Sequence, residues 1–171
     1  SSLSLSSSIR MSIASATGLP VGIKSAVGQS TFWTDLSREM AERQLGPDFI
    51  TIDGGEGGTG AGPLVFTDHV ALPFWQALAT AYGAFCDVGL TDDVVFVGSG
   101  KLGMPSRAAL ALNLGVDLLN VGREAMMAAG CIQAQRCHTG HCPTGVATQN
   151  RWLERGLDPS GKGERVGQYV I

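Results

Sequence analysis

Three cysteines lie close together near the carboxyl-terminal end of the 171-residue sequence. Cys131, Cys137 and Cys142 have the spacing C-x5-C-x4-C, and a proline follows the third cysteine directly. In a chain without a secretion signal, clustered thiols are more often metal ligands or catalysts than disulfide partners. The spacing therefore predicts a metal or cluster site that these three residues share.

Two kinds of site fit this cluster, and free structural thiols are a third possibility, although three so close together among polar residues would be unusual. A structural zinc site needs four ligands, and His138 or His141 could complete a Cys3His set, although the spacing lacks the usual C-x2-C pairs. An iron–sulfur cluster is the other possibility, because a proline after the last cysteine recurs in such sites. Three thiolates suit a three-iron, four-sulfur cluster. The fourth cysteine, Cys86, is expected to be buried within a helix as a small apolar residue.

Two glycine-containing loops suggest a second chemistry. VGSGKLG (97–103) and NVGRE (120–124) each follow an apolar run that is typical of a buried strand. Glycine lets backbone N–H groups approach phosphate oxygens, and Arg123 could add a charge-assisted contact. The pair predicts a phosphate-binding site. The alternative is that these glycines only permit tight turns.

Lys24 and Glu56 are the predicted catalytic side chains. Lys24 stands at the end of an apolar strand, where its ammonium group would point at whatever lies above the sheet. Glu56 is flanked by pairs of glycines in the loop DGGEGGTGAGP (53–63), so it could approach a ligand closely. A lysine that only caps its strand and a glutamate on a solvated loop are the alternatives.

Apolar strands and helical segments alternate along the chain, which predicts an α/β protein with a parallel sheet. The four predicted strands are Leu19–Lys24, Asp48–Gly55, Asp93–Gly100 and Val116–Arg123. The predicted helices are Ser30–Gln44, Pro73–Gly89, Met104–Leu114 and Arg123–Ala129. This spacing matches half of a (β/α)8 TIM barrel, so the chain would be a fragment or would need another chain to complete the barrel. A doubly wound sheet is the alternative, but no G-x-G-x-x-G motif follows the first strand.

Composition narrows the class of function. The net charge is −3 with both signs interspersed, which argues against a nucleic-acid surface. No apolar run reaches the roughly 20 residues of a membrane span. We therefore expect a cytoplasmic protein, with an irregular segment over residues 1–17 and a single folded unit over residues 18–171.

Four motifs in order, GIK, GGEGGTGAGP, GSGKLG and GCIQAQRCHTGHCPTGVATQN, resemble the synthase domain of glutamate synthase and, more closely, the FMN-binding glutamate synthase family. The resemblance runs from about Gly18 to the carboxyl end. It implies an FMN-binding (β/α)8 TIM barrel, of which the chain covers roughly the carboxyl-terminal half, with a [3Fe-4S] cluster in segment 130–150. It also implies that electrons pass from the cluster to FMN. The reduced flavin then delivers hydride to 2-iminoglutarate, formed from 2-oxoglutarate and ammonia.

The resemblance also implies roles for individual residues. Lys24 matches a family lysine near the flavin and the substrate. The cluster ligands would be Cys131, Cys137 and Cys142. The residues that match flavin-binding segments are Gly57, Gly58, Thr59, Gly60, Gly98, Ser99, Gly100, Lys101, Gly122 and Arg123. The implied partners are a 2-oxoglutarate- or glutamate-type molecule and an electron donor such as ferredoxin or a reductase subunit. The alternative is a zinc-stapled α/β module that binds a phosphorylated ligand without redox chemistry.

Overall fold

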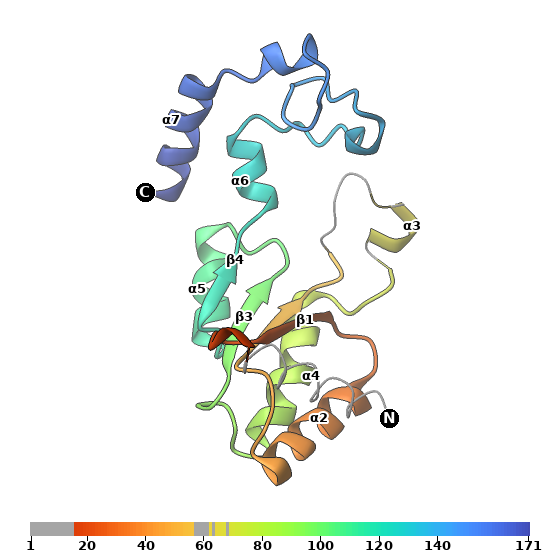
Figure 1. The fold of residues 1–171 in the computed structure, drawn as a ribbon, viewed down its shortest axis with the longest axis vertical. Coiled ribbons are helices and arrows are strands. Elements are labelled where there is room, and N and C mark those ends of the chain that lie inside the picture. Colours follow the sequence, from red (N-terminus) through yellow and green to blue (C-terminus); the bar gives the residue numbers. More distant parts are fainter. Residues whose placement is uncertain (1–15, 57–61, 63, 68) are drawn as a thin grey trace.

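A parallel four-stranded sheet is the centre of the computed structural model, which describes residues 16–56, 62, 64–67 and 69–171. Its strands are β1 (Gly22–Ala26), β2 (Phe49–Asp53), β3 (Val95–Ser99) and β4 (Leu118–Asn120). They lie in the order β1-β2-β3-β4, so each strand pairs with its neighbours along the chain (Figure 1). A doubly wound sheet would reverse direction partway. The predicted α/β class and parallel sheet are confirmed, and the sequential order is compatible with part of a barrel.

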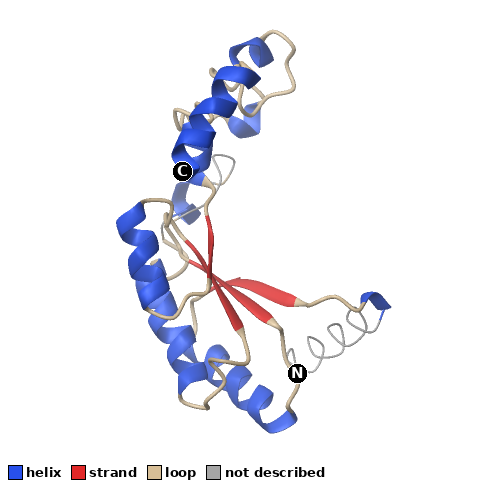
Figure 2. Ribbon diagram, turned by 90° about the vertical axis from the view of Figure 1, so that its left-hand side faces the viewer, coloured by secondary structure: helices blue, strands red, loops and turns tan. Residues whose placement is uncertain are grey.

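Three helices connect successive strands and cover one face of the sheet (Figure 2). They are α2 (Ser30–Arg43), α4 (Phe74–Cys86) and α5 (Pro105–Asn113), all close to their predicted bounds. Placement on one face follows from the right-handed crossover that parallel strands prefer. A further short helix, α3 (Leu64–Thr67), lies in the long loop before α4, where no regular structure was predicted.

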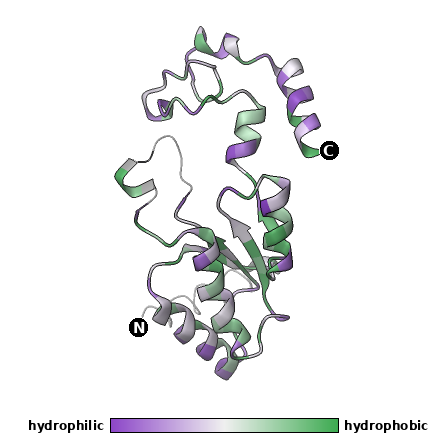
Figure 3. Ribbon diagram, turned by 180° about the vertical axis from the view of Figure 1, so that it is seen from behind, coloured by the Kyte–Doolittle hydropathy of each residue, from purple (hydrophilic) through white to green (hydrophobic). Residues whose placement is uncertain are grey.

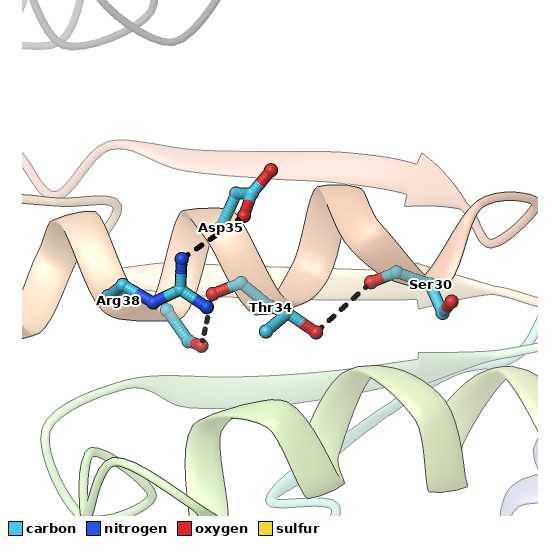
Figure 4. A network of polar contacts seen from close by, with 5 residues as sticks. Ser30, Thr34, Asp35 and Arg38 are labelled. Atoms are coloured by element: carbon cyan, nitrogen blue, oxygen red, sulfur yellow. Dashed lines mark hydrogen bonds and ion pairs between the residues drawn. The ribbon is translucent and has the colours of Figure 1, made fainter.

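The exposed face of α2 shows why this segment is helical and amphipathic. The Thr34 hydroxyl donates to the Ser30 carbonyl at 3.4 Å, and Arg38 pairs with Asp35 at 3.6 Å (Figure 4). Pairs three and four residues apart lie on one face of a helix. The opposite face carries Trp33, which is buried in the hydrophobic core, and α2 packs against α4. α2 therefore keeps its polar network in solvent and contributes its apolar face to the core.

The core lies between this helical layer and the sheet. Ile50 and Ile52 of β2 and Phe96 of β3 are fully buried there. The Phe96 ring makes edge-to-face contacts with Tyr82 and Phe85 of α4, with ring centroids 5.0 and 5.4 Å apart. Such contacts add to the free energy of burying large apolar area. This layer fixes the strands that carry the functional residues at their ends.

The other face of the sheet is not covered by these helices. Side chains alternate along a strand, so the residues between the core positions point to this second face. Val95 and Leu118 are 42% and 58% exposed there. Paired strands place this face's residues in rows at equal height, as in the layered interior of a barrel. The rows are Gly22, Phe49, Val95; then Lys24, Thr51, Val97, Leu118; then Ala26, Asp53, Ser99, Asn120.

The chain continues beyond β4 into a region that sequence analysis described only in part. Helix α6 (Arg123–Ala128) leads into the cysteine segment, residues 130–150, which contains the 3-10 turn η1 (Cys137–Thr139). A second turn, η2 (Leu153–Gly156), precedes α7 (Pro159–Val170), a helix that was not predicted. α7 packs against α6 and carries many hydrophilic residues (Figure 3). Within the described residues, no helix has the length and apolar character that crossing a membrane requires.

Candidate functional site

A cavity of about 540 Å³ lies at the carboxyl end of the sheet, between the strands and the cysteine segment. Each strand contributes one lining residue from the uncovered face: Lys24, Asp53, Ser99 and Asn120. In parallel α/β proteins, ligands bind outside the carboxyl ends of the strands. The cavity is therefore where this sheet would hold a ligand.

Most of the predicted site residues meet at this cavity. Those that line it are Lys24, Ser99, Gly100, Lys101, Gly122, Arg123, Cys131, Cys137 and Cys142. They come from β1, from the end of β3 and the loop after it, from Gly122 and the start of α6, and from the cysteine segment. The residues of the predicted phosphate site and the three cysteines therefore line the same cavity. Gly57, Gly58, Thr59 and Gly60 lie outside the described residues.

Two predicted residues are placed elsewhere. Gly98 is buried, and a Cβ at that position would approach the Leu102, Phe74 and Val116 side chains within about 3 Å. This glycine therefore lets β3 pack against the helical layer. Glu56 is also not among the residues that line the cavity. The predicted cofactor and catalytic roles of these two residues stay predictions.

Glu56 holds the start of α4. Its Oε2 accepts a hydrogen bond from the Phe74 N–H at 2.7 Å, and its Oε1 lies 3.9 Å from the Arg107 guanidinium. Pro73, the residue before the helix, offers no side-chain cap, so a carboxylate from the preceding loop takes that place. Negative charge at a helix amino terminus is stabilising. Arg107 in turn lies over the Trp75 ring, 5.7 Å from its centroid.

The loop after β3 has an unusual backbone. Gly100 has a φ of 150° and Lys101 a φ of 53°, both in the region that disfavours side chains. A Cβ at Gly100 would also lie only 3.1 Å from the Phe74 Cβ, so a side chain there would be crowded as well as strained. The Gly54 N–H donates to the Ser99 carbonyl at 2.7 Å, which ties the end of β2 to this loop. The loop is thus fixed while its backbone faces the cavity.

Lys24 is the middle residue of β1, because the strand continues to Ala26. The expectation that Lys24 ends its strand was therefore wrong. Its ammonium still reaches the cavity, where Nζ lies 3.1 Å from the Asp53 carboxylate on the neighbouring strand. Asp53 stands one row closer to the cavity than Lys24 in the strand register. The pair places one positive and one negative group at the base of the site.

The three thiols have different surroundings. Cys142 is buried, and its pKa is lowered from 9.0 to about 7, chiefly because the Thr144 hydroxyl hydrogen-bonds to the sulfur at 3.5 Å. Cys131 is partly exposed, and its sulfur accepts a hydrogen bond from the Gln133 N–H at 3.4 Å. Cys137 is exposed in η1. Cys142 is therefore the thiol most disposed to the thiolate form that metals bind.

The donor set can be tested against the two predicted kinds of metal site. His138 and His141 are exposed and are not among the cavity-lining residues, so the wall offers three sulfurs and no imidazole. That composition suits a three-thiolate cluster better than a Cys3His zinc site. Among the described residues, no three Cys, His, Asp or Glu side chains converge as closely as a bound metal requires. The thiols share one wall without forming a closed ligand set.

Cys86 does not take part in this wall. It was expected to be buried in a helix, yet it is exposed at the end of α4. The expectation of burial was wrong, because the last turn of α4 turns this position toward solvent.

Several cavity-lining residues were not predicted as site residues, among them Asp53, Asn120, Glu124 and Thr144. Asp53 and Asn120 are polar residues at strand ends, and that position could have identified them. Glu124 gave no such signal, because its burial depends on the packing of α7. Thr144 gave none either, because only the fold shows its hydroxyl beside a thiol.

Comparison with known proteins identifies the family of this chain. Residues 10–171 match the family model described as "Conserved region in glutamate synthase". The chain belongs to the glutamate synthase family. This confirms the resemblance that the four motifs suggested.

Individual relatives agree with the family. The chain is 43% identical over 152 residues to the "Glutamate synthase large subunit-like protein YerD" of Bacillus subtilis (strain 168), covering 89% of this chain and 29% of that protein. It is 38% identical over 123 residues to the "Archaeal glutamate synthase [NADPH]" of Methanocaldococcus jannaschii, covering 72% of this chain and 24% of that protein. It is 36% identical over 128 residues to the "Ferredoxin-dependent glutamate synthase" of Cyanidium caldarium, covering 75% of this chain and 8% of that protein. The chain thus spans less than a third of the length of these relatives.

Proposed function

We propose that this chain is the part of a glutamate synthase-type flavin oxidoreductase that holds the phosphate end of FMN and a [3Fe-4S] cluster. The observation that carries the proposal is the shared cavity, into which both predicted cofactor sites open. A one-electron carrier and a two-electron carrier must lie close together to exchange electrons. The family membership supports the same function.

The flavin phosphate would bind to the two glycine loops. Gly122 has open space where a Cβ would be, so a ligand can approach its backbone closely. Lys101 and Arg123 line the cavity next to these loops and supply positive charge. Backbone N–H groups together with a guanidinium form a common phosphate site. Gly100 keeps the first loop in the required conformation.

The cluster would be held by Cys131, Cys137 and Cys142. Among the described residues the three sulfurs do not converge as closely as a bound metal requires, so they would move closer together when the cluster forms. The lowered pKa of Cys142 favours the first metal–sulfur bond at that residue. When bound, the cluster would supply one-electron transfer and the flavin hydride transfer.

Lys24 would bind a carboxylate of the substrate. An ammonium group at the floor of the cavity suits a dicarboxylic acid such as 2-oxoglutarate or its imine. Because Lys24 pairs with Asp53, a substrate carboxylate would replace Asp53 as its partner. Lys24 thus positions the substrate, and its charge stabilises the carboxylate in place.

The partners of the whole protein are part of the proposal. Relatives are named as ferredoxin-dependent or as NADPH enzymes, which supports ferredoxin or a reductase subunit as the electron donor. The uncovered face of the sheet, with Val95 and Leu118 exposed, supports a (β/α)8 barrel that further strands complete. Those strands would come from another segment or another chain.

Anaerobic reconstitution with iron and sulfide tests the cluster assignment. We expect a broad visible absorption and about three iron atoms per chain, as the [3Fe-4S] assignment requires. Cys137→Ser should lose iron, whereas Cys86→Ser, a matched change at an exposed thiol outside the cavity, should retain it. A colourless protein that binds one zinc ion would overturn the proposal in favour of the zinc-stapled module.

A titration with FMN tests the barrel. With one face of the sheet open, the chain alone should quench FMN fluorescence only weakly. Tight, stoichiometric FMN binding by a monomer would contradict the inference that the chain holds only part of the barrel.

A further inference from the structure

Helix α6 forms a fixed link between the two predicted cofactor sites. It starts directly after Gly122, and its six residues give it a length of about 9 Å. At its other end, the Gly130 N–H donates to the Met127 carbonyl and the Cys131 N–H to the Met126 carbonyl, both at 2.9 Å. With Gly130 at a φ of 104°, these two bonds form a Schellman cap. The backbone of Cys131 is therefore part of the helix end.

Helix α7 lies antiparallel to α6 and contacts both of its ends. Near the start of α7, the Lys162 side chain lies against Gly130, so closely that a Cβ there would clash with the ammonium group. Near the end of α7, the Tyr169 hydroxyl donates to the Gly103 carbonyl at 2.7 Å across 66 residues of sequence. Gly103 belongs to the same loop as Gly100 and Lys101.

The contact at Gly103 is closely packed. The Tyr169 hydroxyl and the Glu124 side chain both stand where a Cβ of Gly103 would be, so only glycine fits. Glu124 is 8% exposed and follows Arg123 in the first turn of α6. Burial, and then the Glu124 charge, raise the pKa of Tyr169, so the phenol remains a hydrogen-bond donor throughout the neutral range. Loop, α6 and α7 therefore meet at one point.

We infer that α7 is a positioning element that couples the predicted phosphate loop to the first predicted cluster ligand, and that Tyr169 transmits this coupling. The contacts run from the loop through Gly103 and Tyr169 to α7, and from Lys162 through Gly130 to Cys131. A ligand that orders the loop would then order the Cys131 backbone, and the reverse holds because coupling is reciprocal. This inference rests on the proposed function for the identity of the ligands.

The first test needs no cofactor. Amide hydrogen exchange of the whole chain, resolved by NMR, reports local opening at the Cys131 N–H. Tyr169→Phe keeps the ring and removes one hydrogen bond, so the protection of this amide should fall about five-fold, while amides of β2 and β3 are unchanged. Tyr82→Phe, the same chemical change in α4, should leave Cys131 at the wild-type value. Unchanged protection at Cys131, or an equal loss at every amide, would overturn the inference.

The second test measures the coupling itself. FMN is added in large excess, because the chain alone is expected to bind it weakly. It should raise the protection of the Cys131 amide in the wild type, and in Tyr169→Phe that increase should shrink about five-fold although FMN still binds. An equal increase in both proteins would overturn the coupling. If FMN shifts no resonance of the loop residues in the wild type, the flavin assignment of this chain fails, while the first test still decides the role of Tyr169.

Discussion

The sheet with its helices and the cysteine segment are held together in different ways. The sheet half consists of strands β1–β4 and helices α2, α4 and α5. It buries large side chains completely, among them Trp33, Phe74, Phe85 and Phe96. In the cysteine segment, only Cys142 and Gly145 are buried, and Ile132 is 67% exposed. Local bonds such as that from the Thr148 hydroxyl to the Gly140 carbonyl keep its shape.

This difference shows how stability and chemistry are divided in the chain. The sheet half draws its stability from apolar burial, which requires no ligand. The cysteine segment buries too little apolar area to do the same, so we expect its order to depend on α6, α7 and the proposed cluster. Changes in the two regions should therefore have unequal effects.

The largest effect is expected in the core. Phe96→Ala should lower the free energy of unfolding by about 3–5 kcal/mol, because it leaves a cavity among Tyr82, Phe85 and the helical layer. Ile132→Ala in the cysteine segment, the matched apolar truncation, should change it by no more than about 0.5 kcal/mol. Urea denaturation followed by far-ultraviolet circular dichroism measures both. Similar losses for the two variants would remove the distinction between the regions.

Cluster loading should affect the second region selectively. Reconstitution with iron and sulfide should slow proteolytic cleavage within residues 130–150 by about ten-fold or more, since ligand binding stabilises the state that binds it. Cleavage within the sheet half should keep its rate. Mass spectrometry of the fragments locates the cuts, and the effect should disappear on chelation of the iron. Equal protection of both regions would show that they are one cooperative unit.

Glu56 tests the junction between the sheet half and the cavity. Glu56→Ala should cost about 1 kcal/mol of unfolding free energy, because the start of α4 loses its carboxylate partner. Glu39→Ala, which removes an exposed ion pair with Arg43 on α2, should cost at most about 0.5 kcal/mol. Thermal denaturation compares the two variants. A Glu56→Ala protein that keeps full stability but loses activity would favour the predicted catalytic role instead.

The stability of the chain should also depend on pH. The pKa of Cys142 is about 7 in the folded chain against 9.0 ordinarily, so folding favours the thiolate. The resulting stabilisation is complete above pH 9, declines as the pH falls, and is lost once the pH drops below about 7. Thr144→Val removes the largest cause and should flatten this dependence. The check is to measure the urea concentration at the unfolding midpoint of the chain without iron at pH 6.5, 8 and 9. The midpoint should rise with pH in the wild type and rise less in Thr144→Val.

Local patterns in the sequence predicted much of this arrangement. The apolar runs and helix-stop signals located four strands and their helices, because buried parallel strands and amphipathic helices have distinct periodicities. The three cysteines were singled out by their spacing, and both glycine loops by their place directly after apolar runs. Each of these features depends on residues that are near one another in sequence.

The missed features depend on contacts between distant residues. Nothing near Glu56 in sequence indicates that its carboxylate reaches Phe74, and nothing near Tyr169 indicates Gly103. Lys24 was placed at a strand end because the polar side chain interrupts an apolar run, whereas pairing with β2 extends the strand to Ala26. Tertiary packing determines these contacts and strand ends, and the local pattern of one sequence does not reveal which distant residues pack together.

The ion pair between Lys24 and Asp53 makes Asp53 a resident competitor for any incoming anion. Both side chains are partly exposed, so the pair contributes at most about 1 kcal/mol. A weakly held monovalent ion such as chloride would gain little from displacing it. A dicarboxylate that also binds other groups of the cavity would gain enough to displace Asp53 from Lys24. The ion pair would therefore favour anions that make several contacts over those that make one.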